Sequence, residues 1–167
     1  MVRSEEPGDF AAIRQVTDRA FGQPAEGRLV DRLRGRVHPW ISLVKERQGR
    51  VLGHVLFTPV TLDRGEHQQD ALALGPMSVD PDHQQQGIGT QLVRAGLDFC
   101  RERGHELVFV LGHPTYYPRF GFVPTVQFGI RWEHPAPEEV FLLAELKKGA
   151  AAGKQGVVRY HPEFEGV

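Results

Sequence analysis

The segment from Val79 to Leu92 constrains the fold more than any other, because Gly87 and Gly89 stand where a loop turns into a helix. Before it, residues 70–79 are apolar and nearly free of charge, as is typical of a buried strand, and Pro81 ends that strand. After it, apolar residues recur at helical spacing, at Ile88, Leu92, Ala95 and Phe99. N–H groups at a helix start lack internal partners and carry the positive end of the helix dipole, and glycine lets a phosphate approach closely. The segment therefore predicts an anion-binding site.

The spacing of the glycines decides which anion is expected. A P-loop requires a lysine after its second glycine, and no lysine occurs between Gly75 and Phe99. A dinucleotide fingerprint requires a third small residue three positions after Gly89, where this chain has Leu92. What remains, Gln84-x-x-Gly87-x-Gly89, resembles the Gln/Arg-x-x-Gly-x-Gly/Ala signature of the GNAT N-acetyltransferase superfamily. Taken alone, the two glycines are equally compatible with a flexible loop before a helix.

A second motif lies at the distance that the GNAT fold requires. In residues 112–122 Tyr117 stands four residues before Gly121 and Phe122, as a tyrosine does in that family. The resemblance covers residues 41–122 closely and the two ends more loosely. It implies an α/β (α+β) fold, with a central, mostly antiparallel mixed sheet flanked by helices and splayed strands that hold acetyl-CoA. We expect one N-acetyltransferase domain over residues 1–167.

Composition narrows the function classes. The formal net charge of -1 gives no basic excess for binding nucleic acid. No run of residues has the apolar length of a membrane span, and the N-terminus lacks the apolar region of a signal peptide, so we expect a cytoplasmic enzyme. A single cysteine, Cys100, and scattered histidines predict no metal site. The β-rich C-terminal third offers an edge through which a homodimer could form.

The remaining elements follow from periodicity and turn residues. Asp9 is expected to cap a first helix over residues 10–21, and a second helix is expected over residues 25–36. Pro59 predicts an edge, bulge or kink within its strand. Strands are expected at residues 1–5, 40–46, 51–62, 71–79, 107–111, 140–146 and 156–160, and the signature helix is expected to end near Gly104.

The resemblance assigns residues to acetyl-CoA. It implies that Gln84 contributes a side-chain amide or shapes the loop, and that the loop N–H groups face phosphate oxygens. Those N–H groups belong to Gln85, Gln86, Gly87, Ile88, Gly89 and Thr90, and Thr90 could add a hydroxyl. The backbone of Met77, Ser78 and Val79 would pair with the pantetheine arm. Pro76, which lacks an N–H, agrees with a strand that leaves regular pairing just before them.

Tyr117 is the candidate general acid toward the CoA thiolate, because a phenol within hydrogen-bond reach of the sulfur can donate that proton. The alternative is an aromatic residue that packs against the cofactor. Tyr116 stands five residues before Gly121 and is expected to be packed or to face the acceptor. Many relatives carry an asparagine and a full helical turn before the tyrosine, but this chain has Gly112-His113-Pro114, so the role of that asparagine does not carry over.

The general base is the least defined assignment. Some relatives place a glutamate on the strand before the loop, whereas here Asp70 is the only acid of that strand and stands at its start. A water-mediated base or a different side chain must therefore serve. His54 and His113 have a suitable intrinsic pKa, although for each a structural histidine bonded to the backbone is favoured. Cys100 falls near the apolar face of the signature helix, where core packing is favoured over a covalent acetyl-enzyme.

The sequence thus predicts an acetyl-CoA-dependent N-acetyltransferase that moves an acetyl group directly to a primary amine of a small molecule, peptide or protein. The alternative is a regulatory GNAT-like module that binds acyl-CoA with little turnover. The missing carboxylate on the strand before the loop and the shortened segment before Tyr117 motivate this alternative.

Overall fold

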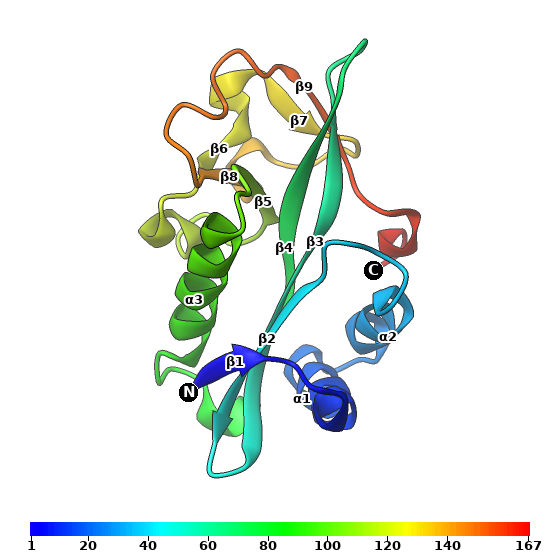
Figure 1. Ribbon diagram of the computed structural model, residues 1–167, viewed down its shortest axis with the longest axis vertical. Coiled ribbons are helices and arrows are strands. Elements are labelled where there is room, and N and C mark those ends of the chain that lie inside the picture. Colours follow the sequence, from blue (N-terminus) through cyan, green and yellow to red (C-terminus); the bar gives the residue numbers. More distant parts are fainter. The chain divides into compact units, whose positions relative to one another are not determined.

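The computed structural model describes residues 1–167 and contains a mixed, mostly antiparallel sheet flanked by helices, as the sequence predicts (Figure 1). The helices are α1 Phe10–Phe21, α2 Ala25–Leu33 and α3 Ile88–Glu102. The strands are β1 Val2–Ser4, β2 Ile41–Arg47, β3 Arg50–Asp63, β4 Gln68–Val79, β5 Leu107–Leu111, β6 Val123–Pro124, β7 Ile130–Trp132, β8 Phe141–Glu145 and β9 Gly156–Arg159. None of the helices combines the length and the apolar character that crossing a bilayer requires.

The chain groups into two compact units. The first contains Met1–Thr58, Gly75–Gly96 and Pro162–Val167, and the second contains Pro59–Leu74 and Leu97–His161. β3, β4 and α3 each continue from one unit into the other. That the whole chain is a single domain stays a prediction.

In the first unit, α1 and α2 cover one face of β2 and β3. β1 pairs antiparallel with β2, and β2 pairs antiparallel with β3. Side chains alternate between the two faces of a strand, and one face of this pair carries a small core with α1 and α2. That core consists of Ile13, Val30, Val44 and Leu56.

The first two turns of α3 lie against the opposite face of β3. Gly53 and Gly96 permit this close approach: a methyl group at Gly53 would stand 2.9 Å from Cδ1 of Leu92, and one at Gly96 would overlap the ring of Phe57. Ile88 and Leu92 are buried, as the helical spacing predicts. The start of α3 is therefore fixed by packing on the sheet as well as by its loop.

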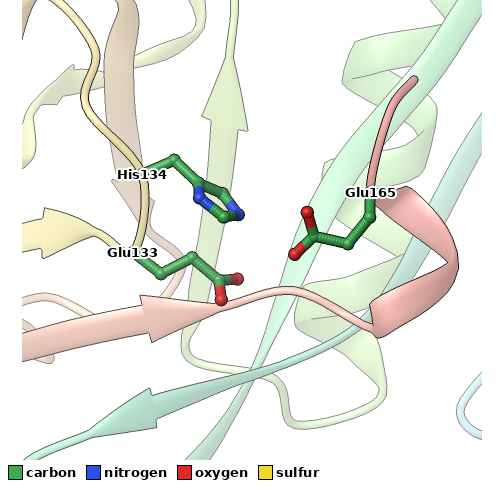
Figure 2. A group of neighbouring side chains, drawn as sticks. All are labelled: Glu133, His134 and Glu165. Carbon is green, nitrogen blue, oxygen red and sulfur yellow. The ribbon is translucent and has the colours of Figure 1, made fainter.

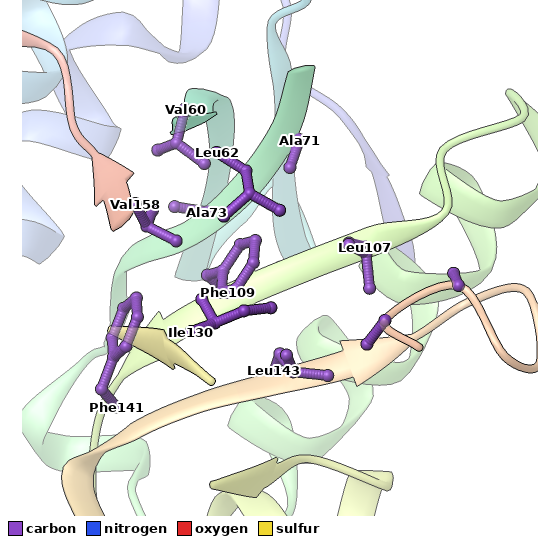
Figure 3. Packing of buried hydrophobic residues seen from close by; sticks show 12 residues of the cluster. Val60, Leu62, Ala71, Ala73, Leu107, Phe109, Ile130, Phe141, Leu143 and Val158 are labelled. Atoms are coloured by element: carbon purple, nitrogen blue, oxygen red, sulfur yellow. The ribbon is translucent and has the colours of Figure 1, made fainter. Parts of the chain in front are cut away.

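The second unit is built around β5, which pairs parallel with β4 and antiparallel with β8. β6 pairs with β8, whereas β9 pairs antiparallel with β3 and parallel with β7. Figure 3 shows the core of this unit, in which Phe109 and Phe141 stack with ring centroids 5.7 Å apart. The buried cluster comprises Val60, Leu62, Ala71, Ala73, Leu107, Phe109, Ile130, Phe141, Leu143, Ala150, Ala151 and Val158.

Three local features can be compared with the sequence predictions. Asp9 does not cap α1 with its side chain: its carboxylate binds Arg3 and the N–H of Glu6, within a 3-10 turn over Pro7–Asp9. The prediction for Pro59 is confirmed in position, because β3 pairs with β2 as far as Phe57 and with β9 only from Thr61. The short strands β6 and β7 were not predicted, because two or three residues carry no measurable periodicity.

Candidate active site

The pairing of β4 changes at Gly75 and Pro76. β4 pairs with β5 only from Leu72 to Leu74, and Gly75 then has a φ of +141°. Proline cannot donate to a ladder, so the regular pairing has a physical reason to stop here. The prediction that the strand departs from its neighbour before Met77 is consistent with this pairing.

β4 also carries an extra residue relative to β3. The N–H of Arg64 bonds the carbonyl of His67 at the hairpin, and the N–H of Asp80 bonds the carbonyl of Leu52 at 2.8 Å. β4 is therefore one residue longer than β3 between these two bonds, which is a β-bulge. Because backbone groups alternate along a strand, the bond made by Asp80 directs the N–H and C=O groups of Met77 and Val79 away from β3.

Side chains at this end of β4 have structural partners. Ser78 is buried, and its hydroxyl lies 3.3 Å from that of Thr17 on α1. Met77 and Val79 are half-buried. The side chain of Ser78 is therefore occupied, and the contacts that the resemblance implies for these three residues use the backbone.

Asp80 anchors the loop that leads to α3. One carboxylate oxygen accepts from Nη1 of Arg19 at 2.6 Å, and the other accepts from the N–H of Asp82 at 2.9 Å. Burial by itself would raise the pKa of Asp80, but the hydrogen bond from the N–H of Asp82, the adjacent imidazole of His83 and the charge of Arg19 hold this pKa below its ordinary value. The carboxylate is therefore ionised at neutral pH and fixes the loop to α1.

The loop itself is exposed and has the backbone of an anion cradle. Gln85 and Gly87 have positive φ values of 63° and 81°, and no atom lies within 4 Å of a methyl group added at Gly87. The first helical hydrogen bond of α3 runs from Gln91 to Gly87, so the N–H groups of Ile88 and Gly89 precede the helical ladder. The side-chain amide of Gln84 donates to the carbonyl of Val79 at 3.3 Å.

Two further predicted loop residues differ in their surroundings. Gln86 is exposed with its neighbours, whereas Thr90 is half-buried in the first turn of α3. The loop residues that the sequence assigns to the cofactor thus form one continuous segment, with Gly87 open to an approaching group.

Tyr117 lies in the second unit and is 8% exposed. Its ring packs against the backbone of Gly112, where a methyl group would overlap it, and meets Phe122 edge to face at 5.6 Å. Burial, with a smaller effect of Tyr116, raises the pKa of Tyr117 to about 12. The phenol therefore keeps its proton at neutral pH. Sequence reasoning had not connected Gly112 with Tyr117.

His113 and Tyr116 flank this tyrosine. His113 is exposed, and its carbonyl accepts from the N–H groups of Tyr116 and Tyr117 at 3.2 and 3.4 Å. Tyr116 is half-buried and stands edge to face with Tyr117 and with Phe120. The packed role expected for Tyr116 agrees with these contacts.

His54 lies inside the first unit. It is fully buried on β3, with Nε2 2.8 Å from the hydroxyl of Ser42. Since Ser42 donates its only hydrogen to Glu5, His54 must donate to Ser42 and carries its proton on Nε2. Burial lowers the pKa of His54 to about 4, and its Nδ1 is buried without a hydrogen-bond partner. This placement favours a structural histidine over a base that meets a substrate.

Glu5 is the centre of that buried network. It also accepts from Nε of Arg34 and from the indole of Trp40, each at 3.0 Å. Burial opposes ionisation, but these hydrogen bonds and that from Ser42 leave the pKa of Glu5 below its ordinary value. Glu5 is therefore ionised and lies beside a neutral His54.

Cys100 is fully buried on α3, and burial raises the pKa of its thiol to about 12. Because the thiolate is the nucleophilic form, this environment supports the predicted core role.

Sequence reasoning missed the anchoring role of Asp80 and Arg19. The available signal was the Asp-Pro-Asp run at residues 80–82, since an aspartate often accepts from the N–H two residues later. No local signal identifies Arg19 as its partner, because the two residues are far apart in the sequence.

Known proteins match this chain in sequence and in fold. The model of the acetyltransferase (GNAT) domain family matches residues 1–125. The uncharacterized N-acetyltransferase YhbS of Escherichia coli strain K12 is 36% identical over 165 residues, which cover 98% of each chain. A crystal structure of E. coli YhbS in complex with CoA superposes with a TM-score of 0.90 at 34% identity, covering 98% of this chain and 91% of that chain. A GNAT acetyltransferase from Brucella melitensis, in complex with acetyl-CoA, gives 0.81 at 36% identity, covering 99% and 97%.

Proposed function

Because the chain belongs to the GNAT family of N-acetyltransferases, we propose that it transfers the acetyl group of acetyl-CoA directly to a primary amine of a small molecule, peptide or protein. The observation that carries this proposal is the loop from Gln84 to Thr90. Its residues Gln84 to Gly87 are exposed, Gly87 has room for an approaching group, and Ile88 begins a long helix whose first N–H groups precede the helical ladder.

The loop fits the pyrophosphate of acetyl-CoA on both shape and charge. A positive φ at Gln85 and Gly87 curves the backbone, and an added side chain at Gly87 would fill the space that a phosphate needs. The relatives from E. coli and B. melitensis were crystallised with CoA and acetyl-CoA, which supports the same co-substrate here. Anchoring by Asp80 and Arg19 reduces the entropy lost when the loop binds.

The end of β4 would hold the pantetheine arm through its backbone. Met77 and Val79 direct their backbone groups away from β3, so their N–H groups can donate to an amide or a thioester carbonyl. A fixed donor beside the carbonyl stabilises the negative charge that develops during acyl transfer. Acetyl-CoA supplies the activated acetyl thioester.

Tyr117 would donate a hydrogen bond, and finally a proton, to the departing sulfur. Its raised pKa of about 12 keeps the phenol protonated, and its packing on Gly112 and Phe122 fixes the ring. General acids of this kind contribute about 10²-fold to 10⁴-fold in rate. For the base we retain the exposed His113, or a water molecule, in preference to the buried His54.

Two matched variants test the cofactor site. Gly87→Glu places a carboxylate in the loop, where it repels phosphate, and Gly104→Glu places the same residue just after α3. Both glycines are exposed, have φ values of 81° and 84°, and have no atom near an added methyl group, so the backbone strain is matched.

The test measures the Tm of each protein by thermal unfolding at increasing concentrations of acetyl-CoA. A ligand at about a hundred times its Kd stabilises a protein by about 2.7 kcal/mol. We expect acetyl-CoA to raise the Tm of the wild type and of Gly104→Glu but not of Gly87→Glu, and CoA release to follow when amines are added. Absence of any shift in the wild type would refute the cofactor site. A shift without transfer to any amine would favour the regulatory module.

A further inference from the structure

The second unit contains a cavity of about 420 Å³ that the cofactor site does not use. It lies among β7, the loop that follows it and the start of β8, and its walls include Trp132 and Phe141. Their rings stack with centroids 6.4 Å apart and an interplanar angle of 28°. The volume falls within the range typical of small-molecule sites, and the walls combine apolar and polar groups as such sites do.

Two carboxylates, Glu133 and Glu138, line the cavity. Glu133 is half-buried and held in place, since one of its oxygens accepts from the N–H of Tyr160 at 2.6 Å. Figure 2 shows that Glu133 and His134 extend to the same side of the loop after β7; Glu165, also drawn there, belongs to the first unit. Arg131 also lines the cavity but is exposed on β7, where alternation turns it away from the face of Trp132.

The cavity neighbours Tyr117 within the same unit. Phe141 is the first residue of β8 and pairs with Leu111, and the N–H of Gly112 bonds the carbonyl of Val140 at 2.9 Å. The ring of Tyr117 packs on Gly112, and Gly112 bonds Val140, the residue before Phe141. Tyr117 is thus connected to the Phe141 wall through the backbone of Gly112 and Val140. Tyr160 packs behind the lining residues and meets Trp132 edge to face at 6.0 Å. Burial, the charge of Glu133 and the phenol of Tyr117 all raise the pKa of Tyr160, which agrees with Tyr160 lying close to both.

We propose that this cavity is the acceptor site and that it binds a primary amine carried on an apolar or aromatic body. The proposal rests on the function proposed above and adds the location and chemical class of the acceptor. In water such an amine is an ammonium ion, which pairs with the carboxylates of Glu133 and Glu138 and is attracted to the face of Trp132. The body of the acceptor packs against the rings of Trp132 and Phe141, which line the cavity. The same carboxylates repel an anionic acceptor.

Binding is tested with phenethylamine, with phenylacetate as a probe of matched shape and opposite charge. The 167-residue protein is saturated with CoA, and its tryptophan fluorescence is followed during each titration. The chain has two tryptophans, Trp40 and Trp132, and a change that comes from Trp132 disappears in Trp132→Phe. We expect phenethylamine to change the fluorescence of the wild type and phenylacetate to leave it unchanged. No change with phenethylamine at 10 mM would overturn the proposal.

The specificity test compares Glu133→Gln with Glu139→Gln. Glutamine keeps the oxygen that accepts from Tyr160 and removes only the charge, and Glu139 is an exposed glutamate that does not line the cavity. Loss of a charge-assisted contact predicts at least a tenfold rise in the Kd and KM for phenethylamine in Glu133→Gln. Equal Kd and KM values in the two variants would overturn the proposal.

These experiments distinguish failure of the acceptor-site proposal from failure of the proposed acetyltransferase function. Binding of acetyl-CoA, read by thermal shift, should be the same in the wild type, Glu133→Gln and Glu139→Gln. If acetyl-CoA binds and an amine is acetylated with a KM that Glu133→Gln leaves unchanged, the cavity is not the acceptor site, while the function stands. If acetyl-CoA does not bind the wild type, the function itself fails.

Discussion

Replacing His54 should remove a defined part of the acid sensitivity of this protein. His54 is fully buried, and burial lowers its pKa from 6.5 to about 4. The charge of Arg34 lowers this pKa further, whereas the charge of Glu5 raises it by less than burial lowers it. The unfolded chain therefore binds a proton to this ring near pH 6.5, whereas the folded protein binds it only near pH 4. Stability is fully present above pH 6.5 and falls as the pH drops toward 4.

The magnitude follows from the shift. Each pKa unit corresponds to about 1.36 kcal/mol, so lowering the pH from 7.5 to 4 should cost the folded state about 3 kcal/mol through His54 alone. His54→Gln keeps a donor for Ser42 but cannot titrate. Other groups, including Glu5, titrate in both proteins and cancel in the difference.

Urea denaturation followed by circular dichroism at pH 7.5 and pH 4 measures this difference. We expect the wild type to lose about 3 kcal/mol more unfolding free energy than His54→Gln over this interval. Equal losses would show that His54 is not held neutral by burial, and the structural role assigned to it would be wrong. Titration of the ring by NMR provides an independent check on the same pKa.

Three further outcomes are expected. Tyr117→Phe removes the phenol hydroxyl but keeps the ring, so kcat should fall about 10²-fold. The Kd for acetyl-CoA, measured by calorimetry, should stay within twofold of the wild-type value. An unchanged kcat would exclude Tyr117 as the general acid. Gly96→Ala places a methyl group against Phe57 and should lower the unfolding free energy by about 1–3 kcal/mol in urea, despite the higher helix propensity of alanine; a more stable variant would contradict this close packing. Asp80→Asn should lower the unfolding free energy by about 1–3 kcal/mol and weaken acetyl-CoA binding, whereas Asp82→Asn, at an exposed residue, should change stability and binding little. Equal effects of the two variants on the thermal shift would refute the anchoring role of Asp80.

The order and type of the long elements could be predicted because their signals are local. The apolar spacing from Ile88 to Phe99 encodes α3, and the uninterrupted apolar run of residues 107–111 encodes β5. Gln48 and Gly49 close the hairpin between β2 and β3 with φ values of 52° and 77°. Such signals depend on neighbouring residues alone, so no knowledge of the fold is needed to interpret them.

The predictions that changed depend on partners that are distant in the sequence. Asp9 resembles a helix cap until Arg3 and the N–H of Glu6 take its carboxylate. His54 has the pKa of a suitable base only in water. Its burial beside Ser42 favours a structural role, and neither the burial nor the partner is encoded near residue 54.

The sequence by itself determined the family and the position of the glycine loop before α3, because the glycine spacing and the apolar periodicity of residues 70–122 act through local backbone geometry. The tertiary structure decided which polar groups are buried, that Asp80 anchors the loop to Arg19, and that Trp132, Glu133 and Phe141 line one cavity. Burial and pKa are properties of the surroundings of a residue. Those surroundings exist only after strands such as β5, β7 and β8 have been brought together by the collapse of the core.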